Sequence, residues 1–451
     1  MQANDKPSVK AELLVNPIGE LVTCAPTDGP LRGLALGRLV KTKQAAIAVA
    51  GGKIIASGTS AEVLDRVTVD AKTKRIEAAD KLVTPGLVDP HTHLVFAGNR
   101  ANEFVLRSQG KSYEDIAAAG GGILATVQAT RQASSQELLE LAHLRLARLL
   151  AHGTTTCEIK TGYGLDLKTE MKLLEVICQL QVEQAVRIIP TFMAAHAVPP
   201  GESENHYVEK VIEEMLPAVV KLVRDHGYRT NQFDAAADNY ERINNRCFID
   251  VFCDRGYFSV SNSRRLLEAG KKAGLAPRIH ADEFANLGAT RLAVELGAAA
   301  ADHLLKTSDE EIRLLAKSDT AAVILPGTSF YLHLKEHAPA RTMIDQGVWT
   351  CLGSDFNPGS CNIFSLPMIL GLACLHLQLT PEEALNCLTV NAAFMLGLGD
   401  QVGQIRDGYR ADITIYDVSC LEEVAANIGW NPVIATIKDG RLVHGDNGIT
   451  T

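Results

Sequence analysis

The sequence predicts an α/β protein, a (β/α)8 TIM barrel joined to a small β-sandwich domain formed from both termini. Three observations predict this fold. Eight short apolar runs in the middle of the chain alternate with stretches whose apolar residues recur at helical spacing. Short β-rich runs broken by glycine turns occupy both ends of the chain. The length of 451 residues leaves room for a companion domain beside a barrel of about 250 residues.

The two ends of the chain share one sequence pattern, in which short apolar runs alternate with turn signals. Residues 1–81 alternate apolar runs with turn signals, as in AELLV and QAAIAVAGGKIIASGT. Residues 396–451 include VGQIRDGYRADITIYDV and VIATIKDGRLVHGD, in which Asp-Gly pairs separate alternating segments and so signal hairpins. We therefore expect one discontinuous β domain built from both ends, with the barrel between them.

The barrel is expected over residues 82–395. Helical periodicity fills the gaps between its strands, as in LKTEMKLLEVICQLQVEQ and SNSRRLLEAGKKAG. A polar, weakly patterned segment at 227–247 is interpreted as an insertion before the fourth strand. The eight expected strands are LVTPGLVDPHTH, TTTCEIKTG, RIIPTFMAAH, FIDVFCD, PRIHADE, AAADHLL, AAVILPGT and WTCLGSD.

Composition excludes several classes of partner. The net charge is −9 and no dense Lys/Arg run appears, so nucleic acid and anionic membrane are not expected partners. A small anionic substrate stays possible, since it needs one local cation. No apolar run reaches about 18 residues, and MQANDKPSVK lacks the apolar core of a signal peptide. The ten cysteines form no C-x-x-C pair, which favours reduced thiols in a cytoplasmic protein.

Polar residues recur where the expected strands end. Catalytic groups of a barrel lie at the carboxyl-terminal ends of its strands, so this face is the predicted active site. The polar strand ends are His91 and His93, Glu158 and Lys160, His196, Asp254, His280 and Glu283, His303, and Ser354 and Asp355.

His91 and His93 are the first candidates for metal binding. They lie two residues apart on a strand, so both side chains point to the same face. An H-x-H pair alone is weak evidence, because a surface loop can contain one. Together with His280 and Asp355 from later strands, the pair favours a metal site, and three imidazoles with one carboxylate suit zinc or iron.

Two further strand-end residues are candidates for proton transfer. Glu283 follows His280 in HADEF and could act on a metal-activated water as general base and then general acid. It could instead be a carboxylate that stabilises the start of a helix. His303 could orient the attacking water or could be a buried, hydrogen-bonded imidazole, and Asp355 could bind metal, accept a proton, or do both.

Arg100 and Tyr163 are candidates for substrate binding. Arg100 follows the first strand, and its guanidinium matches a carboxylate in a fork, although a pair with Glu103 fits its position equally well. Tyr163 lies between two glycines in KTGYGLD, and a tight loop there could present the phenol inward. It could equally be a packed loop aromatic.

The motifs together resemble a known family. HTH with the HADE, ADH and GSD strand ends is similar to the amidohydrolase superfamily. Longer stretches resemble imidazolonepropionases across nearly all of 82–395, and AGNRANEF and EIKTGYGLD are the most specific. These stretches are HTHLVFAGNRANEF, AAAGGGILATVQATRQAS, GTTTCEIKTGYGLDLKTEMK, AAHAVP, IDVFCDRGYF, IHADE, ADHL, ILPGTSFYL and SDFNPGS.

The resemblance implies hydrolysis of the cyclic amide C–N bond of 4-imidazolone-5-propanoate to N-formimidoyl-L-glutamate, the third step of histidine degradation. It implies a homodimer in which Glu283 and His303 transfer protons and orient water. It also implies a single zinc or iron ion, bound by His91, His93, His280 and Asp355. The implied substrate-binding residues are Arg100, Tyr163, His196, Glu283, Asn357, Gly359 and Ser360.

Two other functions compete with this interpretation. Metal-dependent aminohydrolases of purine or pyrimidine bases use a similar ligand pattern, but Arg100 and Tyr163 suit a carboxylate-tailed substrate better than a neutral base. A non-catalytic barrel would be expected to lack metal ligands, whereas all four positions are filled here. No lysine ends the third or fourth expected strand, so no carboxylated lysine is available there to bridge two metals.

Overall fold

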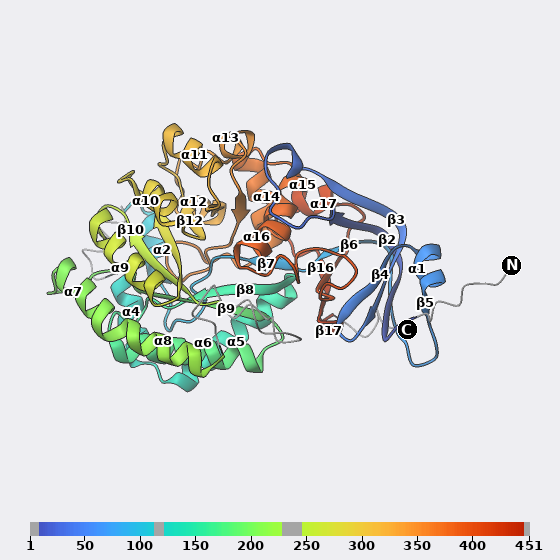
Figure 1. Ribbon diagram of the computed structural model, residues 1–451, viewed down its shortest axis with the longest axis horizontal. Helices are drawn as coiled ribbons and strands as arrows, with labels where there is room; N and C mark the ends of the chain where they lie inside the picture. Colours follow the sequence, from blue (N-terminus) through green and yellow to red (C-terminus); the bar gives the residue numbers. More distant parts are fainter. Residues whose placement is uncertain (1–8, 112–120, 228–245, 446–451) are drawn as a thin grey trace.

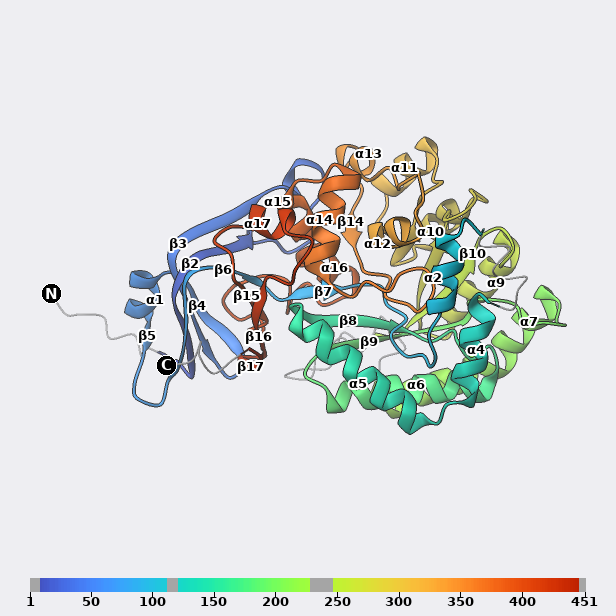
Figure 2. The same cartoon turned by 180° about the vertical axis from the view of Figure 1, so that it is seen from behind.

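In the computed structural model, which describes residues 9–111, 121–227 and 246–445, a barrel and a β domain lie beside each other (Figure 1). The strands of the β domain come from both ends of the chain, as the sequence predicts. Seen from behind, the helices cover the outside of the barrel (Figure 2). The predicted insertion at 227–247 lies outside the described residues apart from its ends.

The barrel sheet has eight parallel strands in sequential order, and all eight predicted strands are present. Its first and last strands meet where Thr92 pairs with Phe356, and the amide of Asp355 donates to the carbonyl of His91 over 3.0 Å. The strands are β7 (Leu87–Asp89), β8 (Thr154–Lys160), β9 (Arg187–Ala195), β10 (Phe248–Cys253), β11 (Ala276–Ala281), β12 (Ala300–His303), β13 (Ala321–Ile324) and β14 (Thr350–Leu352).

Helices connect the strands, and several of them begin at side chains that cap their first turn. Ser134 with Glu137, and Ser308 with Glu311, form capping boxes that satisfy first-turn amides. The helices after β7 are α2 (Ala101–Ser108), α4 (Ile123–Gln132), α5 (Ser135–Ala151), α6 (Leu167–Glu183), α7 (Glu204–Lys210), α8 (Leu216–Asp225), α9 (Val260–Lys272), α10 (Ala289–Leu296), α11 (Asp309–Ala316), α12 (Pro326–Tyr331), α13 (Ala340–Asp345), α14 (Leu366–Leu377), α15 (Pro381–Cys387), α16 (Val390–Met395) and α17 (Leu421–Ala426), with a π-helical turn at Val211–Met215 between α7 and α8.

The β domain contains a seven-stranded mixed sheet in the order β17-β16-β15-β6-β2-β3-β4 and a two-stranded sheet of β1 and β5. Its core consists mainly of buried isoleucine, valine and alanine side chains. Besides a short 3-10 turn at Gly33–Ala35 and helix α1 (Ser60–Arg66), its elements are β1 (Val9–Lys10), β2 (Leu13–Cys24), β3 (Leu39–Ala50), β4 (Lys53–Thr59), β5 (Val67–Thr68), β6 (Lys74–Pro85), β15 (Ile413–Tyr416), β16 (Val433–Lys438) and β17 (Arg441–His444).

The β domain packs against the amino-terminal ends of the barrel strands. The Thr414 hydroxyl donates to the carbonyl of Gly153, just before β8, over 3.1 Å, and the Thr436 hydroxyl donates to the carbonyl of Leu150 over 2.6 Å. The carboxyl-terminal ends of the strands therefore point away from this contact. In the described part of the chain, every helix is too short or too polar to cross a membrane.

Candidate active site

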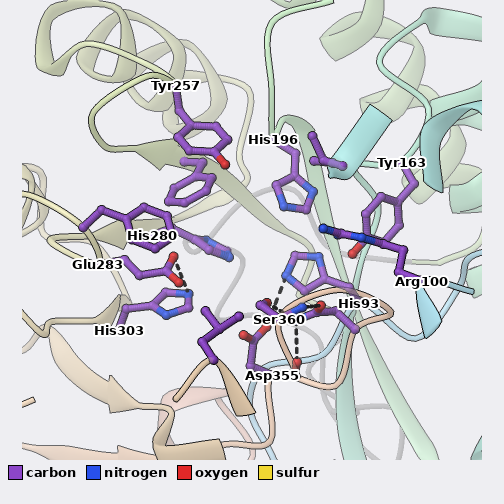
Figure 3. A pocket seen from close by; sticks show the side chains of 15 residues that line it. His93, Arg100, Tyr163, His196, Tyr257, His280, Glu283, His303, Asp355 and Ser360 are labelled. Carbon is purple, nitrogen blue, oxygen red and sulfur yellow. Dashed lines mark hydrogen bonds and ion pairs between the residues drawn. The ribbon is translucent and has the colours of Figure 1, made fainter. Parts of the chain in front are cut away.

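A cavity opens at the carboxyl-terminal ends of the barrel strands (Figure 3). Every predicted site residue lines it except His91 and Gly359. Lining residues that the sequence did not single out are Ile123, Phe252, Tyr257, Phe284 and Leu332. The strand ends thus bring together residues that are far apart in sequence, as the barrel prediction required.

His91 is fully buried beneath the cavity, and its imidazole is held from one side. Its Nδ1 lies 3.0 Å from Oδ2 of Asp302, the residue before His303 on β12. A carboxylate at Nδ1 keeps the proton on that nitrogen and leaves Nε2 as the lone-pair donor. Nε2 lies 3.4 Å from Oδ1 of Asp355 and has no hydrogen-bond partner in the described structure.

His280, on β11, repeats this arrangement. Its Nδ1 lies 3.2 Å from Oδ1 of Asp250 on β10, and its buried Nε2 has no hydrogen-bond partner among the residues described. The ring centroids of His91 and His280 are 4.7 Å apart. Buried polar atoms without partners are costly, so two imidazole nitrogens left unpaired side by side fit a bound metal ion.

His93 and Asp355 extend this group. Nε2 of His93 lies 3.7 Å from Oδ1 of Asp355, while the Thr328 hydroxyl donates to Oδ2 of Asp355 over 2.6 Å. The potential ligand atoms of His91, His93 and Asp355 lie within 4.8 Å of one another. The same holds for His91, His280 and His303, so two overlapping groups share His91.

Burial keeps the imidazoles of His91, His93, His196 and His303 neutral. It lowers the pKa of His91, His93 and His303 well below the ordinary value, with a further decrease from neighbouring Lys160 or histidines. Burial also lowers the pKa of His196 to about 3. Neutral imidazole is the form that binds metals. Burial raises the pKa of Asp355 to about 6, and a cation bound beside this carboxyl group would favour its ionised form.

Glu283 and His303 form a pair at the edge of this group. Oε2 of Glu283 lies 3.7 Å from Nε2 of His303. Burial, and then the charges of Asp355 and Asp254, raise the pKa of Glu283 well above its usual value. A carboxyl group with a raised pKa can hold and release a proton near neutral pH. Glu283 lies outside the neighbouring helix α10 and on the cavity wall, which excludes a helix-start role.

Arg100 lies on the other side of the cavity and is 9% exposed. Its Nε and Nη2 donate to the two carboxylate oxygens of Glu103 over 2.8 and 2.7 Å. The guanidinium also packs on the backbone of Gly359, where a Cβ atom would lie 1.8 Å from Nη1. Glu103 and Gly359 therefore fix the plane of the Arg100 guanidinium. Arg100 pairs with Glu103 and also lines the cavity as a cation, so the two interpretations of this residue are compatible.

Tyr163 and His196 lie beside Arg100. Tyr163 is 2% exposed, and its ring centroid is 5.3 Å from that of His196. His196 in turn stacks on His93 with centroids 4.8 Å apart. Gly162 has φ +109, and a Cβ atom there would lie 2.8 Å from Nδ1 of His196. The glycine before Tyr163 thus permits the close approach of the loop to His196.

Asn357 and Ser360 form the loop beneath Arg100. The side-chain Nδ2 of Asn357 donates to the Ser360 hydroxyl over 2.8 Å. Its side-chain Oδ1 accepts from the backbone amides of Gly359 and Ser360, each over 2.8 Å. These hydrogen bonds from the Asn357 side chain stabilise the loop, and both Asn357 and Ser360 line the cavity.

Besides His91, four of the polar strand-end residues do not line the cavity. Glu158, Lys160 and Ser354 are fully buried in the barrel, and Asp254 accepts from the backbone amides of Phe284 and Ala285. Sequence reasoning also missed Asp250 and Asp302, which hold the imidazoles. A signal was present, since each is a carboxylate inside an otherwise apolar strand, FIDVFC and AADH.

Comparisons with known proteins agree with this fold. The model of the amidohydrolase family matches residues 117–444. Two solved structures share the fold at low sequence identity. One is an adenosine deaminase from Xanthomonas campestris with bound zinc, 18% identical, with a TM-score of 0.69 over 97% of this chain and 94% of that one. The other is E. coli guanine deaminase, 16% identical, with a TM-score of 0.67 over 96% and 99%.

Sequence relatives are more specific. Imidazolonepropionase from Symbiobacterium thermophilum is 45% identical over 434 residues, which cover 96% of this chain and 97% of the relative. Imidazolonepropionase from Herpetosiphon aurantiacus is 44% identical over 436 residues, again 96% and 97% of the two chains. Fold and site define a metal-dependent hydrolase of the amidohydrolase type. Within that class, the chain belongs to the imidazolonepropionase family.

Proposed function

We propose that the protein hydrolyses 4-imidazolone-5-propanoate to N-formimidoyl-L-glutamate in histidine degradation. One observation carries this proposal. On one side of the cavity lie the Glu283–His303 pair and imidazole nitrogens that have no hydrogen-bond partner among the described residues, and on the other side lies the buried Arg100 beside Tyr163 (Figure 3). A cyclic amide with a carboxylate tail matches both sides at once, and the relatives' name supports the same substrate.

His91, His93, His280 and Asp355 are the proposed metal ligands. Three imidazole nitrogens and one carboxylate suit zinc or iron. A metal ion held there would supply Lewis-acid chemistry that polarises the ring carbonyl and activates water. The proposal does not depend on which of the two metals is bound.

Glu283 is the proposed proton carrier. It takes a proton from the attacking water and returns one to the ring nitrogen that leaves when the C–N bond breaks. Its buried position next to His303 lets that imidazole hold the water in line with the ring carbonyl. One water adds and no other molecule leaves, so every nitrogen of the substrate stays in the product.

Arg100 and Tyr163 are proposed to bind the propanoate tail. Glu103 holds Nε and Nη2 of Arg100 and so fixes the guanidinium on the cavity wall, where its positive charge would attract the tail. His196, which stacks on His93, would lie along the ring. Asn357, Gly359 and Ser360 shape the floor beneath it. We expect the enzyme to act in the cytoplasm as a homodimer.

The test is an absorbance assay of purified, metal-loaded protein with freshly generated 4-imidazolone-5-propanoate, with guanine and cytosine in parallel. Loss of the imidazolone signal that a chelator abolishes is the expected result. Release of ammonia from a base, without imidazolone turnover, would replace the proposal with a base deaminase.

A further inference from the structure

A cluster of charged side chains is buried inside the barrel, beneath the proposed metal ligands. All of its members have no exposed surface. With three carboxylates and two cations, it is an extensive ion-pair network in a protein interior, where unpaired charges are very costly. Its members are Glu158, Lys160, Asp250, Arg278 and Asp302.

Lys160 lies at the centre of this cluster. Its ammonium, at the end of β8, is 2.8 Å from Oδ2 of Asp250 on β10 and 3.7 Å from Oδ2 of Asp302 on β12. It also donates to Oε1 of Glu158 over 2.9 Å. The side chain thus crosses the barrel interior and joins alternate strands, whose inward side chains form one layer of a barrel.

Each of the two carboxylates across the barrel has a second contact. Asp302 holds Nδ1 of His91 at 3.0 Å, and Asp250 holds Nδ1 of His280 at 3.2 Å. With Nδ1 held in this way, Nε2 of both imidazoles has no hydrogen-bond partner among the described residues, and Nε2 of His91 lies 3.4 Å from Oδ1 of Asp355. The orientation of two proposed ligands therefore depends on where the two carboxylates are held.

Lys160 is the cation that the two carboxylates share most directly. Arg278 pairs with Asp302 over 2.8 Å, but in the described structure Asp250 has no salt bridge to a lysine or arginine other than Lys160. The potential ligand atoms of Asp250, His280 and Asp302 also lie within 4.8 Å of one another. The ammonium therefore supplies a fixed positive charge at a group of oxygens and nitrogen that would otherwise suit a cation.

We propose that Lys160 is a positioning residue for the metal site: it holds Asp250 and Asp302, which orient His280 and His91. The inference rests on the proposed metal site, and it adds a residue that lines no part of the cavity. Partners of ligating histidines orient the ring and tune its basicity, and their loss weakens metal binding about 10- to 100-fold.

The test compares two buried lysines. Lys160→Met removes the ammonium while keeping the length of the side chain. Lys438→Met is the matched control, since Lys438 on β16 is 3% exposed and pairs with Asp412 over 2.9 and 3.0 Å in the β domain. Zinc affinity is measured by competition with a chromophoric chelator, and folding by circular dichroism and Tm.

We expect Lys160→Met to raise the Kd for zinc by about 10- to 100-fold and Lys438→Met to lower Tm without changing that Kd. Equal zinc affinity in folded Lys160→Met and the wild-type protein would overturn the positioning role and leave the proposed function standing. A wild-type protein that binds no zinc or iron at His91 and His280 would instead overturn the metal site and this inference with it.

Asp302→Asn provides a second variant if Lys160→Met does not fold. The amide keeps the shape and an acceptor for Nδ1 of His91, but it loses the charge that Lys160 and Arg278 hold in place. Weaker zinc binding in the folded variant, with cobalt absorption bands shifted from those of the wild-type protein, is expected. Unchanged affinity together with unchanged cobalt bands would refute the proposal.

Discussion

The two sides of the cavity differ in how their polar groups are satisfied. On the metal side, Nε2 of His91 and of His280 is buried without a hydrogen-bond partner in the described structure. On the opposite side, Arg100 already forms a two-pronged pair with Glu103. The metal side therefore has acceptor atoms that could bind a cation, whereas the Arg100 side has a cation that Glu103 already holds in a fixed orientation.

This difference predicts different costs of mutation. Removing a ligand from the metal side removes the group on which the chemistry depends, so binding of metal and turnover fail together. Changing the Arg100 side alters the orientation of the substrate and leaves the chemistry intact. Substitutions on the two sides should thus separate effects on kcat from effects on KM.

His280→Ala is expected to have the largest effect. It removes an imidazole whose Nε2 has no partner in the described residues, so the variant should lose both bound metal and measurable activity. Elemental analysis of the purified protein checks the first effect and the absorbance assay the second. A variant with full metal content would remove His280 from the ligand set.

Glu283→Gln is expected to have the second largest effect on activity. The amide keeps the size of the side chain but cannot carry the proton, so kcat should fall by about 10²- to 10⁴-fold while metal content stays unchanged. Steady-state kinetics and elemental analysis on the same preparation check this. Retained turnover would show that another group transfers the proton.

Arg100→Ala should act mainly on KM. Loss of a charged hydrogen-bond donor to the propanoate costs about 1.5–3 kcal/mol, roughly a 10- to 100-fold rise in KM. Because the change leaves the buried carboxylate of Glu103 without its partner, Tm is measured alongside. An unchanged KM in the folded variant would refute the carboxylate-binding role.

Gly359→Ala should have the smallest effect on this side. A Cβ atom would lie 1.8 Å from Nη1 of Arg100, so the guanidinium must shift and KM should rise less than in Arg100→Ala. Gly429→Ala is the matched control, because a Cβ atom there meets nothing within 4 Å. If the two variants have the same KM, the position of the guanidinium does not matter for binding.

Much of the fold could be predicted from the sequence because the physical signals were local. Apolar runs that alternate with helix-periodic stretches located all eight strands, and the His, Asp and Glu residues at most of their ends located most of the cavity. The contacts that orient the proposed metal ligands join residues from different strands, so no local sequence signal indicates them. Nδ1 of His91 contacts Asp302 on β12, which is distant in the sequence, whereas Nδ1 of His280 contacts Asp250 on the neighbouring strand β10. Both pairs become visible only when the strands are placed in space.

The same reason explains Lys160. In the sequence it is a polar strand end beside Glu158, with no visible partner. Its meeting with Asp250 and Asp302 requires the positions of β8, β10 and β12 in space. For Arg100, the sequence allowed two partners, Glu103 or a substrate, and could not decide between them. In the structure the guanidinium pairs with Glu103 and also lies on the cavity wall.

Analysis of the product tests whether water opens the ring without loss of nitrogen. The metal-loaded enzyme is incubated with 4-imidazolone-5-propanoate in isotopically labelled water, and the product is examined by mass spectrometry while ammonia is measured. The account predicts N-formimidoyl-L-glutamate with one solvent oxygen in its new carboxylate and no ammonia. Release of ammonia in proportion to substrate consumed would contradict it.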